Sequence, residues 1–326
     1  MYALRVSSLV AVLAGLATVI SSLALLGNGN KAVAQDSGLE AGVTATVRAA
    51  VDAYNRRDFG AFISYWTDKG FMEEIEFTKA EAATDEEFFG DQIVLRAVRD
   101  ITATSTGATA IVELEFGLGV EANKFTFILV DGRWRIDGST AASAAIPPGT
   151  NLVDMKLQEY AFVYDKNAVV GGNIAFKAQN VGREDHEIVV VKVDASLAVA
   201  DFLETIMSEG EGEEEGGPPP FEDFGFLGVF KPGDSGTAAF SRTLGAGKYF
   251  LVCFLEAPDG LPHIAKGMIS EFTVGPGTGG AIRPPSTGDA GLIGGSGNMR
   301  AALQALGVTL LFAGASAGLR SRRVHA

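Results

Sequence analysis

The sequence has little sulfur and little imidazole, because its 326 residues include one cysteine and three histidines. A single cysteine excludes a framework of intramolecular disulfide bonds. Basic residues are too few to balance the acidic ones, and the net charge of −14 argues against nucleic acid and anionic lipid as partners. Apolar residues are not scarce. At 47% of the chain they can build a core, and the length predicts about two domains.

The N-terminus has the pattern of an export signal. An apolar run from Val6 to Leu26 precedes Ala32 and Ala34, which are small residues at the spacing that signal peptidase reads. The sequence therefore predicts a signal peptide over residues 1–34. An uncleaved membrane anchor is the alternative, because the apolar run is long for a signal.

The C-terminus has the pattern of a membrane anchor. Residues 299–319 include an apolar run long enough to cross a bilayer, and arginines follow in a short tail over 320–326, which predicts a transmembrane helix with a cytoplasmic end. A buried soluble helix is the alternative. Upstream, Pro284 to Gly288 resembles the Leu-Pro-x-Thr-Gly signal of sortase substrates, with proline in place of leucine. Both routes predict an extracytoplasmic protein anchored to the membrane or cell wall by its C-terminus.

Two breaks in composition divide the chain between these ends. Residues 139–151 are small, polar and proline-bearing and predict a linker, whereas residues 275–298 are rich in glycine and proline and predict a stalk. One domain is therefore expected over residues 39–138 and a second over 152–274. The second contains an acidic insert at 208–224 that reads as a loosely held, solvated loop.

The first domain begins with helical spacing and continues with strand-like runs, which predicts an α+β layout. A hairpin is expected at Asp131-Gly132, between two alternating apolar runs. The stretch VDAYNRRDFGAFISYWTDKG, together with FILVDGRWRIDG, resembles the nuclear transport factor 2-like superfamily, including its SnoaL-like branch. The resemblance implies a cone with a pocket, a fold that hosts enzymes, binders and inert modules alike.

The residues of this domain do not indicate catalysis. It contains neither histidine nor cysteine, and no spacing pairs its candidate acid–base groups, which are Asp52, Tyr54, Asp68, Glu73 and Glu74. The tryptophans, Trp66 and Trp134, are expected to lie in the core. An enzymatic role is therefore not expected here.

The second domain changes to short alternating runs separated by turn signals. An example is the run from Met155 to Asp165, and a helical period intrudes only from about Leu197 to Met207. Six or seven strands at this spacing predict an all-β sandwich.

Chemistry-bearing residues cluster late in this domain. Cys253, His263 and Met268 fall within 18 residues, and His186 lies earlier, between two strand-like runs. Two imidazoles and one thiolate with a weak thioether are the ligand set of a blue-copper site. Pro258 to Pro262 should turn the chain and return His263 to the thiol. The alternative is that the cysteine, histidines and methionine are ordinary buried residues.

The stretches NVGREDHEI, KPGDSGTAAF, GAGKYFLVC and DGLPHIAKGMISEFTV resemble a cupredoxin of the plastocyanin and azurin type. The resemblance implies a Greek-key sandwich and one type 1 copper ion, with His186, Cys253 and His263 as strong ligands and Met268 as the axial ligand. It departs from the family in two ways. The loop from cysteine to histidine is longer than in plastocyanin, and charged residues rather than an apolar patch precede the first histidine.

These observations predict a surface-tethered copper protein that transfers single electrons outside the membrane to a redox partner protein. Nitrite or oxygen reduction would need further copper sites, and the exported part has no spare histidines for them, because His325 lies in the C-terminal tail. Two alternatives stay open. One is copper capture or delivery without electron transfer. The other is a metal-free cupredoxin-like binding module.

Overall fold

The computed structural model describes residues 38–75, 78–84, 88–208 and 221–275. The expected signal peptide and the transmembrane helix fall outside this part, as do the tail, nearly all of the stalk and most of the acidic insert. Within the described ranges, no helix combines the length and the apolar character needed to cross a membrane.

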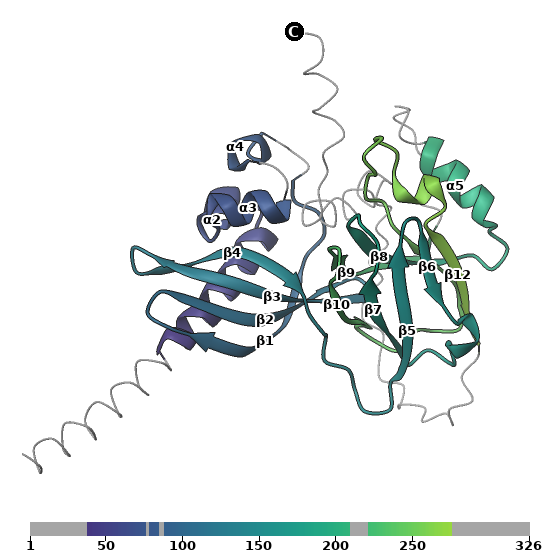
Figure 1. Cartoon of the computed structure of the whole chain (residues 1–326), viewed down its shortest axis with the longest axis horizontal. Coiled ribbons are helices and arrows are strands. Elements are labelled where there is room, and N and C mark those ends of the chain that lie inside the picture. Colours follow the sequence, from purple (N-terminus) through teal and green to yellow (C-terminus); the bar gives the residue numbers. More distant parts are fainter. Residues whose placement is uncertain (1–37, 76–77, 85–87, 209–220, 276–326) are drawn as a thin grey trace, which may run out of the picture.

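The N-terminal domain packs helices against one antiparallel sheet (Figure 1). A helix over residues 38–55 comes first and is followed by α2 (Phe59–Ser64), α3 (Asp68–Ile75) and α4 (Lys79–Ala82). The strands are β1 (Val94–Ala103), β2 (Gly107–Phe116), β3 (Gly119–Val130) and β4 (Arg133–Ala141). Buried residues of the helices and strands share one core, and both tryptophans lie in it as expected.

The hairpin between β3 and β4 turns at the expected dipeptide. Val130 pairs with Arg133, and the two residues between them have φ values of 50° at Asp131 and 74° at Gly132. Positive φ at both central residues is what a tight two-residue hairpin needs, and aspartate and glycine tolerate it best. The local sequence alone therefore predicted this turn.

The C-terminal domain is a sandwich of two four-stranded layers. Its strands are β5 (Asn151–Gln158), β6 (Ala161–Tyr164), β7 (Ile174–Asn180), β8 (His186–Val193), β9 (Asp223–Phe230), β10 (Ser235–Phe240), β11 (Gly247–Val252) and β12 (Ile269–Val274). One layer has the order β10-β7-β5-β6 and the other β12-β11-β8-β9. The described domain has eight strands rather than six or seven, because the alternating run after Met155 breaks at Glu159 and Tyr160 into β5 and β6.

Strand β8 is apolar without alternation because both of its faces are covered. Ile188 and Val190 face the core between the two layers, whereas Val189 and Val191 face the core that reaches into the first domain. Helix α5 (Val199–Ser208) packs on that outer side. A strand buried on both faces reads as a continuous hydrophobic run.

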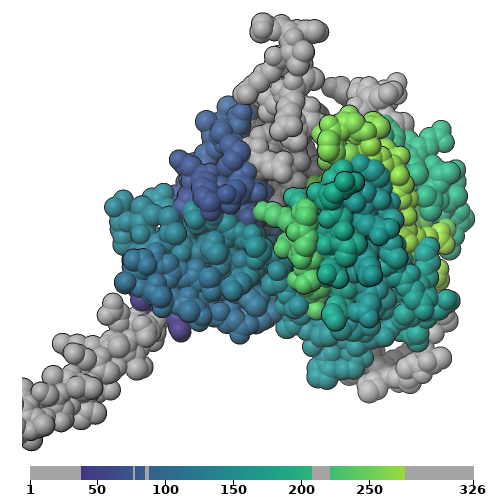
Figure 2. All heavy atoms as spheres, viewed as in Figure 1, coloured from purple at the N-terminus to yellow at the C-terminus, as the bar shows by residue number. Residues whose placement is uncertain are grey.

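The two domains are joined through a shared β-sheet and not only through the segment that connects them. The start of β3 pairs with β10, so that one eight-stranded sheet runs from β1 to β6. The start of β3 also passes close to β9, and glycine permits this contact, because a Cβ at Gly119 would lie 1.9 Å from the carbonyl oxygen of Phe226. The segment 139–151 begins inside β4, and its Ala144 N–H donates to Thr237 across the junction. Figure 2 shows the two domains, purple to blue and teal to yellow-green, as bodies in contact.

Candidate metal centre

Three of the four candidate ligands lie at strand ends in the second domain. His186 is the first residue of β8, Cys253 directly follows β11, and Met268 directly precedes β12. His263 begins a short 3₁₀ helix, η3 (His263–Lys266). All four are almost completely buried, with at most 1% of each residue exposed.

Three of these side chains converge on one point. The Nδ1 atoms of His186 and His263 are 3.2 Å apart, and the Cys253 Sγ lies 3.3 Å from His263 Nδ1. One ligand atom from each residue fits within a set whose members all lie within 4.8 Å of one another. The structure therefore assembles a buried nitrogen–sulfur–nitrogen donor set from positions 77 residues apart in the sequence.

The loop from Cys253 to His263 folds back on itself, as its proline and glycine content predicted. Gly260 adopts a φ of 81°, a conformation that glycine reaches without steric cost. The N–H of Ala257 donates to the carbonyl of Leu261, and the N–H of His263 donates to that of Leu255. These bonds return the imidazole to the thiol, so the greater length of the loop does not separate the two ligands.

Met268 is tied to the site through its backbone. Its N–H donates to the carbonyl of His263 at 2.9 Å, and its carbonyl accepts from the N–H of Cys253 at 3.2 Å. The side chain is buried in the same apolar cluster as the cysteine. An axial role for the thioether stays a prediction, because the contacts that hold Met268 here are those of its main chain.

The electrostatics of the site favour neutral donors in the metal-free protein. Burial and the neighbouring imidazole lower the pKa of His186 to about 4, and burial lowers the pKa of His263. Burial and the nearby Glu187 carboxyl raise the pKa of the Cys253 thiol. Neutral imidazoles and a desolvated sulfur suit a soft transition-metal ion, whose charge would displace the thiol proton. The donor set therefore fits copper.

Glu187 lies against the donor set and was not among the residues predicted from the sequence. It is fully buried directly after His186, and its N–H donates to the Cys253 Sγ at 3.4 Å. Its Oε1 accepts from the N–H of Phe254 at 2.6 Å, whereas its Oε2 is buried without a hydrogen-bond partner. Burial raises the pKa of this carboxyl to about 7. The available signal was a glutamate inside the apolar run of β8, which alternation would place in the core.

A small apolar cavity lies within the described part of the first domain. It measures about 30 Å³ and is lined by apolar and aromatic side chains that include Tyr54, Phe62 and Trp66. The Tyr54 hydroxyl accepts from the N–H of Gly90, and burial raises its pKa far above the usual range. A space of this size holds about one water molecule. The resemblance implied a pocket, and this cavity is too small for a ligand much larger than water.

The acid–base candidates of the first domain do not gather in that cavity. Asp52, Asp68 and Glu73 are exposed, and Glu74 is buried but lies at the domain junction. The N–H and the hydroxyl of Ser139 both donate to the Glu74 carboxylate at 2.8 Å. These positions give the domain no paired catalytic groups among its described residues.

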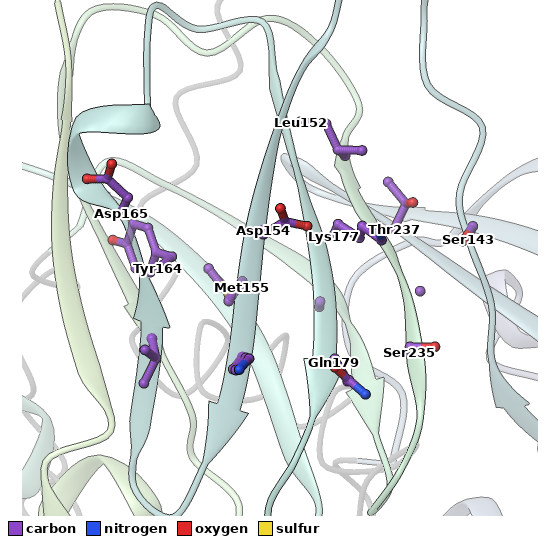
Figure 3. Close-up of a pocket in the computed structure, with 14 residues that line it drawn as sticks. Ser143, Leu152, Asp154, Met155, Tyr164, Asp165, Lys177, Gln179, Ser235 and Thr237 are labelled. Carbon is purple, nitrogen blue, oxygen red and sulfur yellow. The ribbon is translucent and has the colours of Figure 1, made fainter.

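A larger hollow lies on the outer face of β5, β6, β7 and β10. It measures about 820 Å³ and is open to solvent, with Leu152 and Val163 both more than 40% exposed at its wall. Asp154 and Lys177 stand on neighbouring strands within it (Figure 3). Its lining contains neither histidine nor cysteine. It therefore offers fewer reactive groups than the buried donor set.

Comparisons with known proteins give structural neighbours only. No family model matches the sequence, and no curated protein matches it. Among solved structures, an NTF2-like protein of unknown function from Shewanella oneidensis MR-1 is 17% identical, with a TM-score of 0.24, and covers 30% of this chain and 93% of its own. Auracyanin from Roseiflexus castenholzii is 24% identical, also with a TM-score of 0.24, and covers 39% and 98%. Auracyanin B is 18% identical, with a TM-score of 0.24, and covers 41% and 97%.

Both resemblances expected from the sequence therefore occur among the structural neighbours. The chain is similar to NTF2-like proteins in one part and to cupredoxins in another. The feature of this chain that points to a function is the convergence of His186, Cys253 and His263.

Proposed function

We propose that this protein holds one type 1 copper ion and passes single electrons to a redox partner protein. The observation that carries the proposal is the buried convergence of two Nδ1 atoms and one Sγ at the end of a β-sandwich. Copper would supply the one-electron chemistry. The chain supplies a fixed set of donors and excludes water from them.

The surrounding residues suit such a role because they resist rearrangement. Two ligands are attached to neighbouring strands of one sheet, since β8 pairs with β11. The N–H of Glu187 points at the sulfur, and the Met268 backbone bonds to both Cys253 and His263. A ligand set that stays in place in both oxidation states needs little reorganisation when an electron arrives or leaves.

We also propose where the protein lies and that it carries a single metal site. An export signal and an anchor in the sequence support a protein tethered outside the cytoplasm by its C-terminus. The single donor set found in the described residues supports an electron carrier rather than a reductase with several metal sites. The first domain is then a module attached to the electron-transfer domain, with no catalytic role of its own.

Copper loading of the purified ectodomain tests this function. Cu(II) should produce an intense visible band from charge transfer between the Cys253 thiolate and copper, together with a reversible reduction potential. Cys253→Ser should abolish the band, because serine does not provide the thiolate donor. Met155→Leu is the matched control, since it removes another buried sulfur of the same core cluster and should leave the band intact.

The other outcomes decide against the proposal in different ways. Tight Cu(I) binding without the visible band would replace electron transfer by copper capture or delivery. An ectodomain that takes up no copper would leave a metal-free binding module. A Cys253→Ser variant as blue as the parent would show that the ligands have been wrongly assigned.

A further inference from the structure

The two imidazoles of the donor set differ on their outer sides. The Nε2 of His186 is buried and has no hydrogen-bond partner in the described part of the chain. The Nε2 of His263 lies 2.9 Å from the Oε2 of Glu184. A carboxylate oxygen can only accept, so the imidazole Nε2–H donates and the Nδ1 lone pair is left facing the donor set.

Glu184 is itself held from two sides. Its backbone N–H donates to the Glu159 carboxylate at 3.0 Å, and the N–H of Arg183 donates to the same carboxylate. Its backbone carbonyl accepts from the side-chain amide of Asn180 at 2.8 Å. Asn180 is 1% exposed and also donates to Phe230, so the bond anchors this loop to the core. The loop before β8 is therefore fixed where its carboxylate reaches His263.

An aromatic side chain completes the arrangement from the turn between β5 and β6. The Tyr160 hydroxyl donates to the Oε1 of Glu184 at 3.3 Å. The centre of the Tyr160 ring lies 5.0 Å from the centre of the His263 imidazole. The ammonium group of Lys266 lies 4.9 Å from the centre of the tyrosine ring. The outer edge of this imidazole is covered, and the residue is only 1% exposed.

We propose that Glu184 is the positioning residue for His263, holding the imidazole so that Nδ1 is presented to the metal. Its carboxylate sets the tautomer and the ring orientation, and Tyr160 holds the carboxylate in place. The role rests on the proposed copper site. An ordered carboxylate behind a ligating imidazole typically strengthens metal binding by 10- to 100-fold.

The two imidazoles are also held in place by different contacts. His186 is fixed by burial and by the start of β8, without a carboxylate behind it. His263 begins η3 at the end of the loop from Cys253, and its ring orientation depends on side-chain torsions that the main chain does not set. The carboxylate of Glu184 supplies a contact that sets this orientation. This role accounts for one of the charged residues that precede His186, where the cupredoxin resemblance implies an apolar patch.

Substitution of Glu184 tests the inference, with Cu(II) alone as the probe. Glu184→Ala should weaken copper binding by about 10- to 100-fold in a chelator competition and alter the visible band. Glu184→Gln keeps an acceptor oxygen and should lie between that variant and the parent. Glu271→Ala removes a glutamate of the same domain whose carboxylate pairs with Lys248, and should bind copper as the parent does.

A second readout needs no metal. Nitrogen NMR of the metal-free parent should show the His263 proton on Nε2, and Glu184→Ala should lose this preference, whereas Glu184→Gln should retain it. Parental affinity together with an unchanged His263 tautomer in Glu184→Ala would overturn the positioning role while leaving the copper site intact. A parent that binds no copper would instead overturn the proposed function and, with it, the role of Glu184.

Discussion

The two domains both bury polar groups inside apolar cores, but only the second brings those groups together. In the first domain the interior is filled by aromatic rings in edge-to-face contact, such as Phe62 with Phe71 and Trp66 with Phe71. In the second, two imidazoles and a thiol replace apolar packing at one end of the sandwich. The second domain therefore gathers buried metal-binding groups, whereas the aromatic rings of the first domain contribute packing.

The junction between the domains belongs to neither pattern. Glu121 is 2% exposed on β3, and its Oε1 accepts from the Asn123 amide at 2.7 Å. Its Oε2 is buried without a hydrogen-bond partner, and a Cβ on Gly228 of the other domain would lie 3.6 Å from its Cγ. A buried carboxyl with one unpartnered oxygen costs free energy when it is ionised. Its effect on the stability of the protein should therefore change with pH.

The packing role of the first domain is tested most strongly by Phe71→Ala. Phe71 is fully buried, and its loss should lower the free energy of unfolding by about 3 to 5 kcal/mol. Its neighbour Met72 is 40% exposed, so Met72→Ala should cost less than about 1 kcal/mol. Denaturant titration measures both. Equal effects would mean that the cone is not tightly packed and that the contrast between the domains fails.

Copper binding by the same variant sharpens the contrast. Phe71 lies outside the donor set, so the folded fraction of Phe71→Ala should bind copper with parental affinity. A weakened affinity in fully folded protein would show that the cone contributes directly to the site.

Gly119→Ala should have the next largest effect, because it disturbs the close contact between β3 and β9 at the domain junction. The new Cβ would meet the Phe226 carbonyl oxygen at 1.9 Å, so the junction must shift, at a cost of roughly 1 to 3 kcal/mol. Gly107→Ala is the matched control on β2, where the nearest atom lies at 3.4 Å, and it should change stability by less than about 1 kcal/mol. Thermal or denaturant unfolding compares the two. Parental stability in Gly119→Ala would show that β3 and β9 do not approach each other this closely at the junction.

The smallest expected effect is that of Glu121→Gln, and it depends on pH. Burial raises the pKa of Glu121 to about 7, and Glu74 adds to the rise. The folded protein therefore binds more protons than the unfolded chain between about pH 4.5 and 7, so the parent loses stability as pH rises through that window. The amide does not titrate, and the variant should exceed the parent by roughly 1 to 2 kcal/mol at pH 8 and match it near pH 4.5.

The control for this prediction lies on the neighbouring strand. Glu115 pairs with Arg96 at 2.7 Å, so Glu115→Gln loses an ion pair and should show no gain at pH 8. Unfolding titrations at several pH values measure this effect. A difference in the free energy of unfolding between Glu121→Gln and the parent that stays constant from pH 4.5 to 8 would contradict the raised pKa of Glu121.

Much of the site was predictable because its residues are rare. One cysteine and two histidines in a β-rich domain leave few possible ligand sets, and turn residues between Cys253 and His263 indicate a loop that returns. The supporting carboxylates were not predictable in the same way. Glu184 and Glu187 read as two glutamates among forty acidic residues, and only their distances to His263 and Cys253 distinguish them.

The fold shows the same contrast between features that were predictable from the sequence and features that were not. Strand-like runs predicted strands in both domains, and the Asp131-Gly132 pair predicted a hairpin, because both signals are local. The break between β5 and β6 and the pairing of β3 with β10 were not predicted. Strand partners depend on contacts between distant segments, which periodicity does not encode.

The sequence by itself determined which elements form and which side chains are available to bind a metal, since helical and strand periods and residue chemistry are properties of short segments. Only the tertiary structure decided that the ligands converge, that Glu187 and Glu121 are buried, and that aromatic rings of the first domain pack against one another. Those outcomes depend on which surfaces pack together, and burial of a charged or aromatic group is a property of its neighbours in space rather than in the chain.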